Sequence, residues 1–119
     1  MKKKLSVAVF SGYTILVAIV SLKPGGGGGF LVEPYDKLAH LLTYAVFATL
    51  AWRLRLLPRH FFYLCIAIVV YGGLLELGQS FVPNRSMSGL DLLANTMGVL
   101  LGALFSARLY SSPGSMDTR

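Results

Sequence analysis

The sequence predicts an all-α protein, a four-transmembrane-helix bundle in which the chain weaves up and down through a lipid bilayer. Apolar residues make up 55% of the 119 residues, charged residues only 13%, and the mean hydropathy is +0.65. Four stretches approach the length of about 20 apolar residues that a helix needs to cross about 30 Å of hydrocarbon. The connections between them are too short to bury a separate soluble core, so we expect one membrane domain over residues 1–119.

The first predicted helix covers residues 5–22 and follows three lysines, a pattern that also occurs in secretory signals. Its apolar run exceeds the about 7 to 15 residues of a signal core, and Ser-Leu-Lys-Pro-Gly follows it instead of a small-x-small cleavage site. These features favour a retained helix. Residues 25–29 are all glycine and predict a flexible loop. A phosphate-binding loop is disfavoured, because no Gly-Lys-Ser/Thr sequence follows.

The other three helices are predicted over residues 38–57, 61–82 and 90–110. Pro58 lies between the second and third of them and predicts a short turn, which makes these helices antiparallel neighbours. Residues 111–119 are mostly polar and predict a mobile tail. The lone Cys65 has no partner for an intramolecular disulfide and is interpreted as a small apolar residue.

The net charge is +6. The placement of the basic residues indicates how the helices are oriented in the membrane and does not indicate nucleic-acid binding. Most basic residues fall on the side of the two termini, namely Lys2, Lys3, Lys4, Arg53, Arg55, Arg59, Arg108 and Arg119. The other side carries Lys23, Lys37 and Arg85. Because cytoplasmic loops are enriched in Lys and Arg, we expect both termini in the cytoplasm and the two longer loops outside.

With this orientation, three helices place polar residues in one shallow outward layer. At about 1.5 Å per residue, Glu76 lies roughly 7 Å and His40 about 4 to 5 Å below the outer boundary. Spacings of three and four residues align the polar groups on one face of each helix. These groups are Asp36, Lys37, His40 and Tyr44 on the second helix, Glu76 and Gln79 on the third, and Asp91 and Asn95 on the fourth.

Ionisable groups in a membrane cost several kcal/mol unless they are paired or wetted. We therefore expect the three polar faces to meet in a cleft that opens to the outside. Gly98 and Gly102 continue the polar stripe of the fourth helix inward, and Gly72 and Gly73 adjoin Glu76. Small residues of this kind let helix backbones approach closely in lipid, so they predict tight helix packing beside the cleft.

Each of these polar residues could have a structural role as well as, or instead of, a role in ligand binding. Asp36 fits an N-cap of the second helix, and Ser88 with Asp91 three residues later fits a capping box. Lys37 and Arg85 could extend to the lipid headgroups as interfacial side chains. Residues that could serve in packing or in interhelical hydrogen bonds are His40, Tyr44, Glu76, Gln79 and Asn95.

Three motifs carry a resemblance to a known family. They are D-K-x-x-H-x-x-x-Y at residues 36–44, E-x-x-Q at residues 76–79 and R-x5-D-x3-N-x2-G-x3-G at residues 85–102. Together they resemble the VanZ-like family of small bacterial membrane proteins over about residues 36–102, without the first helix. The sequence departs from the expected pattern at Leu41, where an aromatic residue is expected, and in its short outer loops.

The resemblance implies a multi-pass protein of the bacterial cytoplasmic (inner) membrane with a role in the cell envelope. The family is named for a protein associated with low-level resistance to the glycopeptide teicoplanin. One hypothesis is a non-enzymatic protein whose cleft binds a lipid headgroup or a lipophilic glycopeptide. Lys37 and Arg85 would attract phosphate, and His40, Glu76 and Asn95 would orient the ligand. The expected partners are membrane lipid, a lipid-linked envelope precursor or a glycopeptide, and a homo-oligomer stays open.

A second hypothesis is an intramembrane transferase or hydrolase acting on a lipid-linked envelope substrate, with His40 as base and Glu76 or Asp91 as acid or orienting group. A metal site from these three residues is weakly indicated, because one histidine without HExxH spacing is a poor signal. We therefore predict no metal and no cofactor. A small exporter is a third hypothesis, which the shallow position of Glu76 disfavours, since alternating access needs a carboxylate near the midplane.

The predicted orientation can be tested by cysteine labelling in a background in which Cys65 is replaced by Ala. Gly27→Cys and Asn84→Cys should react with an impermeant thiol reagent added outside intact cells, because both loops are expected there. Arg55→Cys and Ser115→Cys should react only after the membrane is opened. Labelling of the second pair in intact cells would reverse the orientation.

Overall fold

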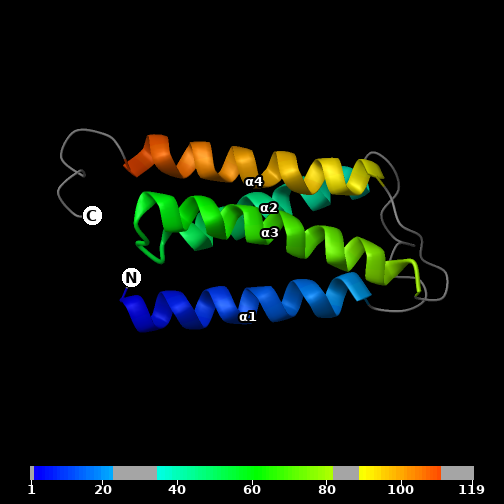
Figure 1. The fold of residues 1–119 in the computed structure, drawn as a ribbon, viewed down its shortest axis with the longest axis horizontal. Helices are drawn as coiled ribbons and strands as arrows, with labels where there is room; N and C mark the ends of the chain where they lie inside the picture. Colours follow the sequence, from blue (N-terminus) through cyan, green and yellow to red (C-terminus); the bar gives the residue numbers. More distant parts are fainter. Residues whose placement is uncertain (1, 23–34, 82–88, 111–119) are drawn as a thin grey trace.

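The computed structural model describes residues 2–22, 35–81 and 89–110. They form four helices, α1 (Lys3–Leu22), α2 (Tyr35–Trp52), α3 (Pro58–Gln79) and α4 (Gly89–Tyr110), with no strand among the described residues. Successive helices run in opposite directions, so that α1 begins and α4 ends beside the turn that joins α2 to α3 (Figure 1). The predicted all-α weave is confirmed.

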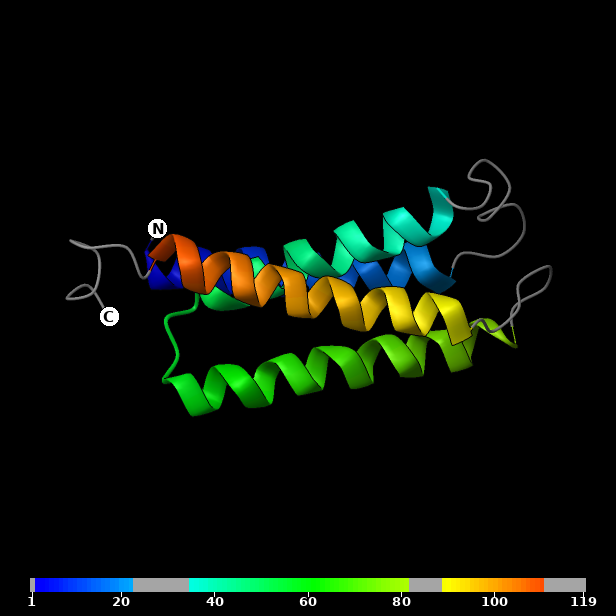
Figure 2. The same cartoon turned by 90° about the horizontal axis from the view of Figure 1, so that it is seen from above.

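The helices form a bundle in which α2 and α3 lie between α1 and α4 (Figure 1). In the perpendicular view, α2 and α3 lie on opposite sides of α4 (Figure 2). Two ends of the bundle can be distinguished: the turn end, with residues 53–57, and the loop end, where α1 and α3 end and α2 and α4 begin. The glycine run 25–29 and the tail 111–119 lie outside the described residues.

The boundary of α2 differs from the prediction, because the helix ends at Trp52 and not at residue 57. Arg55 reverses the chain with a φ of 58°, in the left-handed region that ends many helices. Leu57 is extended, with φ −58° and ψ 151°, as a residue before proline tends to be. Pro58 then occupies the first turn of α3, where its missing N–H removes no hydrogen bond. The apolar residues before Pro58 therefore belong to the turn, and the short turn itself was predicted.

Helix α2 also begins earlier than predicted, at Tyr35 instead of residue 38. Asp36 consequently lies inside the first helical turn, and its prediction as the N-cap is wrong. At the start of α4, Asp91 lies in the first turn as the capping box requires. Its partner Ser88 lies outside the described residues.

Three of the helices, α1, α3 and α4, are long and apolar enough to cross a membrane. Helix α2 does not meet that criterion, because Asp36, Lys37 and His40 lower the hydropathy of its first turns. Large apolar side chains such as Ile15 and Leu104 are exposed on the outside of the bundle, whereas polar groups are buried inside it. This inside-out distribution is that of a membrane protein. A crossing by α2 stays a prediction.

The closest packing in the bundle joins α2 to α4 at glycines. A Cβ atom added to Gly98 would lie under 3.0 Å from the carbonyl oxygen of Leu41, and one added to Gly102 equally close to that of Ala45. The two backbones therefore touch, as the small-residue stripe predicted. At Gly72 a Cβ would lie 3.1 Å from the Asn95 amide nitrogen, so this glycine also makes room. Gly73 does not, since its Cβ would make only an ordinary contact, at 3.6 Å from a leucine methyl group.

An aromatic core fills the middle of the bundle around Phe47, which is fully buried. The rings packed around it, at centroid distances of 5.2 to 5.9 Å, belong to Phe10, Tyr13, Tyr44 and Tyr71. Two of them also hold α1 in place. The Tyr13 hydroxyl donates to the carbonyl oxygen of Thr43 at 2.6 Å, and the Tyr71 hydroxyl donates to that of Thr14 at 2.6 Å.

The close contacts at the glycines predict how replacing a single glycine by alanine changes the stability of the bundle. Gly98→Ala and Gly102→Ala should each destabilise the bundle by about 1–3 kcal/mol, because the added carbon forces α2 and α4 apart. The measurement is the free energy of unfolding in detergent. Gly12→Ala is the matched control, since nothing lies within 4 Å of its added Cβ, and it should be neutral or stabilising. Equal changes in unfolding free energy for the substitutions at positions 12, 98 and 102 would show that the backbones of α2 and α4 do not touch at Gly98 and Gly102.

Candidate functional site

Five polar residues from three helices gather near the loop end of the bundle. We call this set the polar cluster; it consists of Lys37, His40, Glu76, Asp91 and Asn95. Glu76 is 2% exposed, Asn95 1% and Asp91 9%, so the acidic and amide groups are buried. The side chains of Lys37 and His40 remain 21% and 24% exposed. Access to the cluster is therefore greatest beside these two basic side chains.

The position of the cluster follows from the packing of α2 against α4. Lys37 and His40 lie on one face of α2, one turn apart, and Asp91 and Asn95 do the same on α4. Gly98 lies one turn further along the Asn95 face, against the carbonyl of Leu41. Because the backbones touch there, the polar first turns of both helices are brought within reach of each other.

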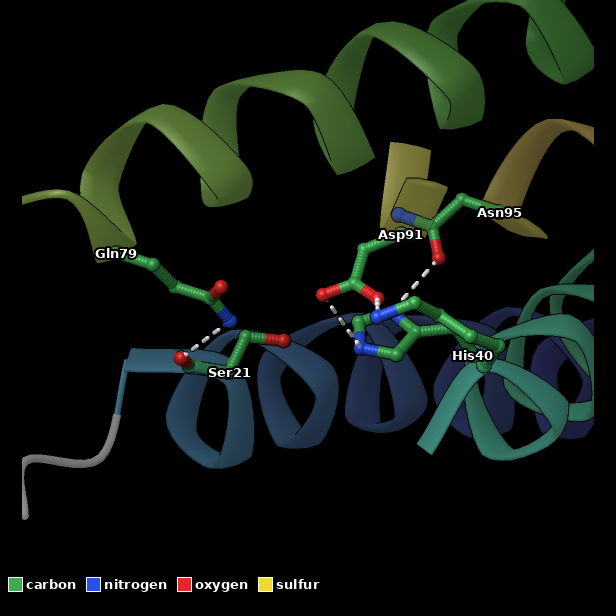
Figure 3. A network of polar contacts seen from close by, with 6 residues as sticks. Ser21, His40, Gln79, Asp91 and Asn95 are labelled. Carbon is green, nitrogen blue, oxygen red and sulfur yellow. Dashed lines mark hydrogen bonds and ion pairs between the residues drawn. The ribbon is translucent and has the colours of Figure 1, made fainter. Parts of the chain in front are cut away.

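The contacts within the cluster are short and specific (Figure 3). His40 Nδ1 lies 2.9 Å from Asn95 Oδ1, and Lys37 Nζ lies 2.8 Å from Asp91 Oδ1. Since an amide oxygen only accepts, His40 Nδ1 carries a hydrogen and donates it to Asn95. The other ring nitrogen, Nε2, faces Asp91 Oδ2 at 3.5 Å, which is beyond the range of an ordinary hydrogen bond.

Glu76 completes the cluster from α3. One ligand atom each from His40, Glu76 and Asp91 lie within 4.8 Å of one another. Glu76 and His40 thus lie close together, and coupling between them stays a prediction. Two carboxylates buried at this distance need positive charge nearby, because both charges are removed from water. Lys37 supplies one such charge, through its ion pair with Asp91.

Tyr44 lies one turn deeper than His40 on α2 and is buried. Its ring packs on Phe47 at a centroid distance of 5.6 Å. Its hydroxyl and Cε2 lie 3.1 Å from the position of a Cβ on Gly72. Tyr44 therefore joins the polar cluster to the aromatic core below it, instead of standing in an open cleft.

Gln79 follows Glu76 on α3 but has a different partner. Its side-chain nitrogen donates to the carbonyl oxygen of Ser21 at 2.8 Å, in the last turn of α1 (Figure 3). The bond satisfies one of the carbonyls that a helix end leaves without an intrahelical partner. The sequence did not reveal this contact, because a backbone acceptor leaves no side-chain pattern. Asp36's side chain and all of Arg85 lie outside the described residues.

Comparison with known protein families agrees with these motifs. A model of the VanZ/LLP1 family matches residues 4–110, which is nearly the whole chain. The chain belongs to the VanZ/LLP1 family. The match includes α1, so it extends beyond the residues 36–102 that the motifs had indicated. None of the curated proteins and none of the solved structures compared with the chain gave a match.

The three motifs of this VanZ/LLP1 chain meet in space. The first supplies Lys37 and His40, the second Glu76, and the third Asp91 and Asn95. The glycines that end the third motif hold α4 against α2. Residues that are far apart in the sequence thus form one partly buried unit, in which every motif contributes at least one charged or polar side chain.

The proximity of His40 and Glu76 predicts that their contributions to stability are not independent. The double change Glu76→Gln with His40→Ala should cost less than the sum of the single changes, by about 0.5–3 kcal/mol. The coupling is measured from the free energies of unfolding, in detergent, of the wild type, the two single variants and the double variant. Glu76→Gln combined with Gly12→Ala serves as a control pair and should be additive. Additivity of the His40 and Glu76 changes would mean that the two groups act separately.

Proposed function

We propose that this VanZ/LLP1 protein binds the polar headgroup of a membrane lipid or of a lipophilic glycopeptide at the outer side of the bacterial cytoplasmic membrane. The observation that supports the proposal is the convergence of charged groups from α2, α3 and α4 at the loop end, with Lys37 and His40 partly exposed. At the depth expected for this end, lipid headgroups are the molecules within reach.

The cluster offers both kinds of hydrogen-bonding group to such a ligand. Lys37 donates, whereas the Asp91 and Glu76 carboxylates accept. The ion pair with Asp91 moderates the attraction of Lys37 for phosphate, so a phosphate ligand would also need Arg85. The association of the family's namesake with teicoplanin resistance supports a lipophilic glycopeptide, or the lipid-linked envelope material that such drugs recognise, as the ligand.

An intramembrane enzyme acting on a lipid-linked envelope substrate is the second candidate. The observation in its favour is the orientation of His40 by Asn95, which holds the ring with Nε2 toward Asp91. A fixed imidazole beside a carboxylate is an arrangement that serves general-base catalysis. An exporter has less support, because the aromatic core around Phe47 fills the bundle below the cluster.

Binding and catalysis make different demands on His40. His40→Asn and His40→Gln keep hydrogen-bonding groups but do not titrate near neutral pH, so a binding protein should tolerate at least one of them in part. Lys37→Ala combined with Arg85→Ala should cause a severe loss, because phosphate attraction is removed. The measurements are the lipid that co-purifies with the protein, identified by mass spectrometry, and teicoplanin susceptibility of cells expressing each variant.

The matched control is Arg59→Ala, which removes an exposed basic residue near the turn end. It should leave both readouts unchanged. Glu76→Gln should lose the co-purifying lipid. Complete inactivation by both conservative His40 changes, in protein that is folded and inserted in the membrane, would reject the binding function in favour of the enzyme.

A further inference from the structure

Three side chains of the polar cluster also carry the donor atoms that a metal ion requires, a property that the headgroup proposal does not use. His40 from α2, Glu76 from α3 and Asp91 from α4 each offer one potential ligand atom, and these atoms all lie within 4.8 Å of one another. Although their sequence pattern alone predicted no metal, we propose that these three residues bind one divalent transition-metal ion, with Zn²⁺ as the representative ion. The inference goes beyond the proposed function and does not depend on it.

The distances suit such an ion. Two ligands held tetrahedrally at about 2.1 Å from zinc are themselves about 3.4 Å apart. His40 Nε2 and Asp91 Oδ2 lie 3.5 Å apart, which is long for a hydrogen bond but close to this separation. A carboxylate oxygen of Glu76 lies within 4.8 Å of a ligand atom of each of the other two residues, and it would come closer to them in the metal-bound state.

The surroundings of the three residues resemble the outer shell of a metal site. A metal-binding histidine typically donates its second ring N–H to a carbonyl or carboxylate oxygen, which fixes the ring and its tautomer. His40 Nδ1 does this with Asn95 Oδ1 at 2.9 Å, leaving Nε2 as the ligand atom. Lys37 Nζ contacts Asp91 Oδ1, so Oδ2 is the oxygen that faces His40. Both outer partners thus orient a proposed ligand.

The carboxyl groups of Glu76 and Asp91 are both buried, and Lys37 contacts that of Asp91. A divalent cation between them and His40 Nε2 would attract both carboxylates and the lone pair of the ring nitrogen at once.

The donor set indicates the class of metal. One imidazole nitrogen with two carboxylate oxygens suits a first-row divalent ion, whereas Mg²⁺ and Ca²⁺ prefer oxygen ligands alone. Three protein ligands leave a further position for water or for an oxygen of a bound molecule. The ion would link α2, α3 and α4 near the loop end of the bundle.

The test uses the full chain in detergent, purified with a tag that contains no histidine and treated with a chelator. Zn²⁺ is then added, and its stoichiometry and affinity are measured by elemental analysis and calorimetry. We expect about one ion per chain. Glu76→Gln, Asp91→Asn and His40→Ala should each weaken binding at least about 100-fold, and Asn95→Ala about 10- to 100-fold through the outer shell.

His60→Ala is the matched control, because His60 is exposed and lies in the first turn of α3, away from the cluster. The affinity of the His60→Ala variant for Zn²⁺ should equal that of the wild type. X-ray absorption of the wild-type zinc complex provides a readout that needs no variant, and it should show nitrogen and oxygen ligands from protein. The proposal would be overturned if the wild type bound no stoichiometric Zn²⁺, or if the three ligand variants bound it as tightly as the wild type. It would also be overturned if X-ray absorption showed only water around the bound ion.

Discussion

The contact between the backbones of α2 and α4 is the constraint on which the rest of the structure depends. Gly98 and Gly102 let the carbonyls of Leu41 and Ala45 approach α4 without an intervening side chain. Once this register is set, His40 comes to face Asn95, and Lys37 to face Asp91. His40 precedes Leu41 by one residue and Asn95 precedes Gly98 by three, and Lys37 and Asp91 lie about one turn further from the contact on their helices. The geometry of the polar cluster is thus a consequence of packing that takes place deeper in the bundle.

Such a constraint is needed because burial of apolar surface does not drive helix association in lipid as it does in water. The exposed leucines and isoleucines of this bundle are equally well accommodated by lipid chains. Specific pairing must then come from close backbone contact, from aromatic packing around Phe47, and from polar groups that have no other partner at that depth. The buried Glu76 therefore helps to define which helix faces meet, at the same time as it provides a possible ligand-binding group.

Sequence reasoning predicted the helices and the meeting of Lys37, His40, Glu76, Asp91 and Asn95, because helical spacing and the cost of burying charge leave few alternatives. It misplaced the end of α2, since leucines continue to Pro58 and only the backbone of the turn shows where the helix stops. For Gln79 it left an interhelical hydrogen bond open but did not identify the acceptor, a main-chain oxygen of α1. Errors of this kind arise wherever backbone geometry, rather than side-chain type, selects the partner.

The attachment of α1 has a consequence for how freely its sequence can change during evolution. Two hydrogen bonds that attach α1 to α3 are accepted by main-chain carbonyl oxygens of α1, those of Thr14 and Ser21. The donors are the side chains of Tyr71 and Gln79 in α3. Every amino acid provides the same carbonyl group, so substitutions at these two positions preserve both acceptors as long as the helix persists. The specificity of these two contacts is therefore encoded in α3, and within α1 the side chains at positions 14 and 21 can diverge, unlike Phe10 and Tyr13, which pack on Phe47.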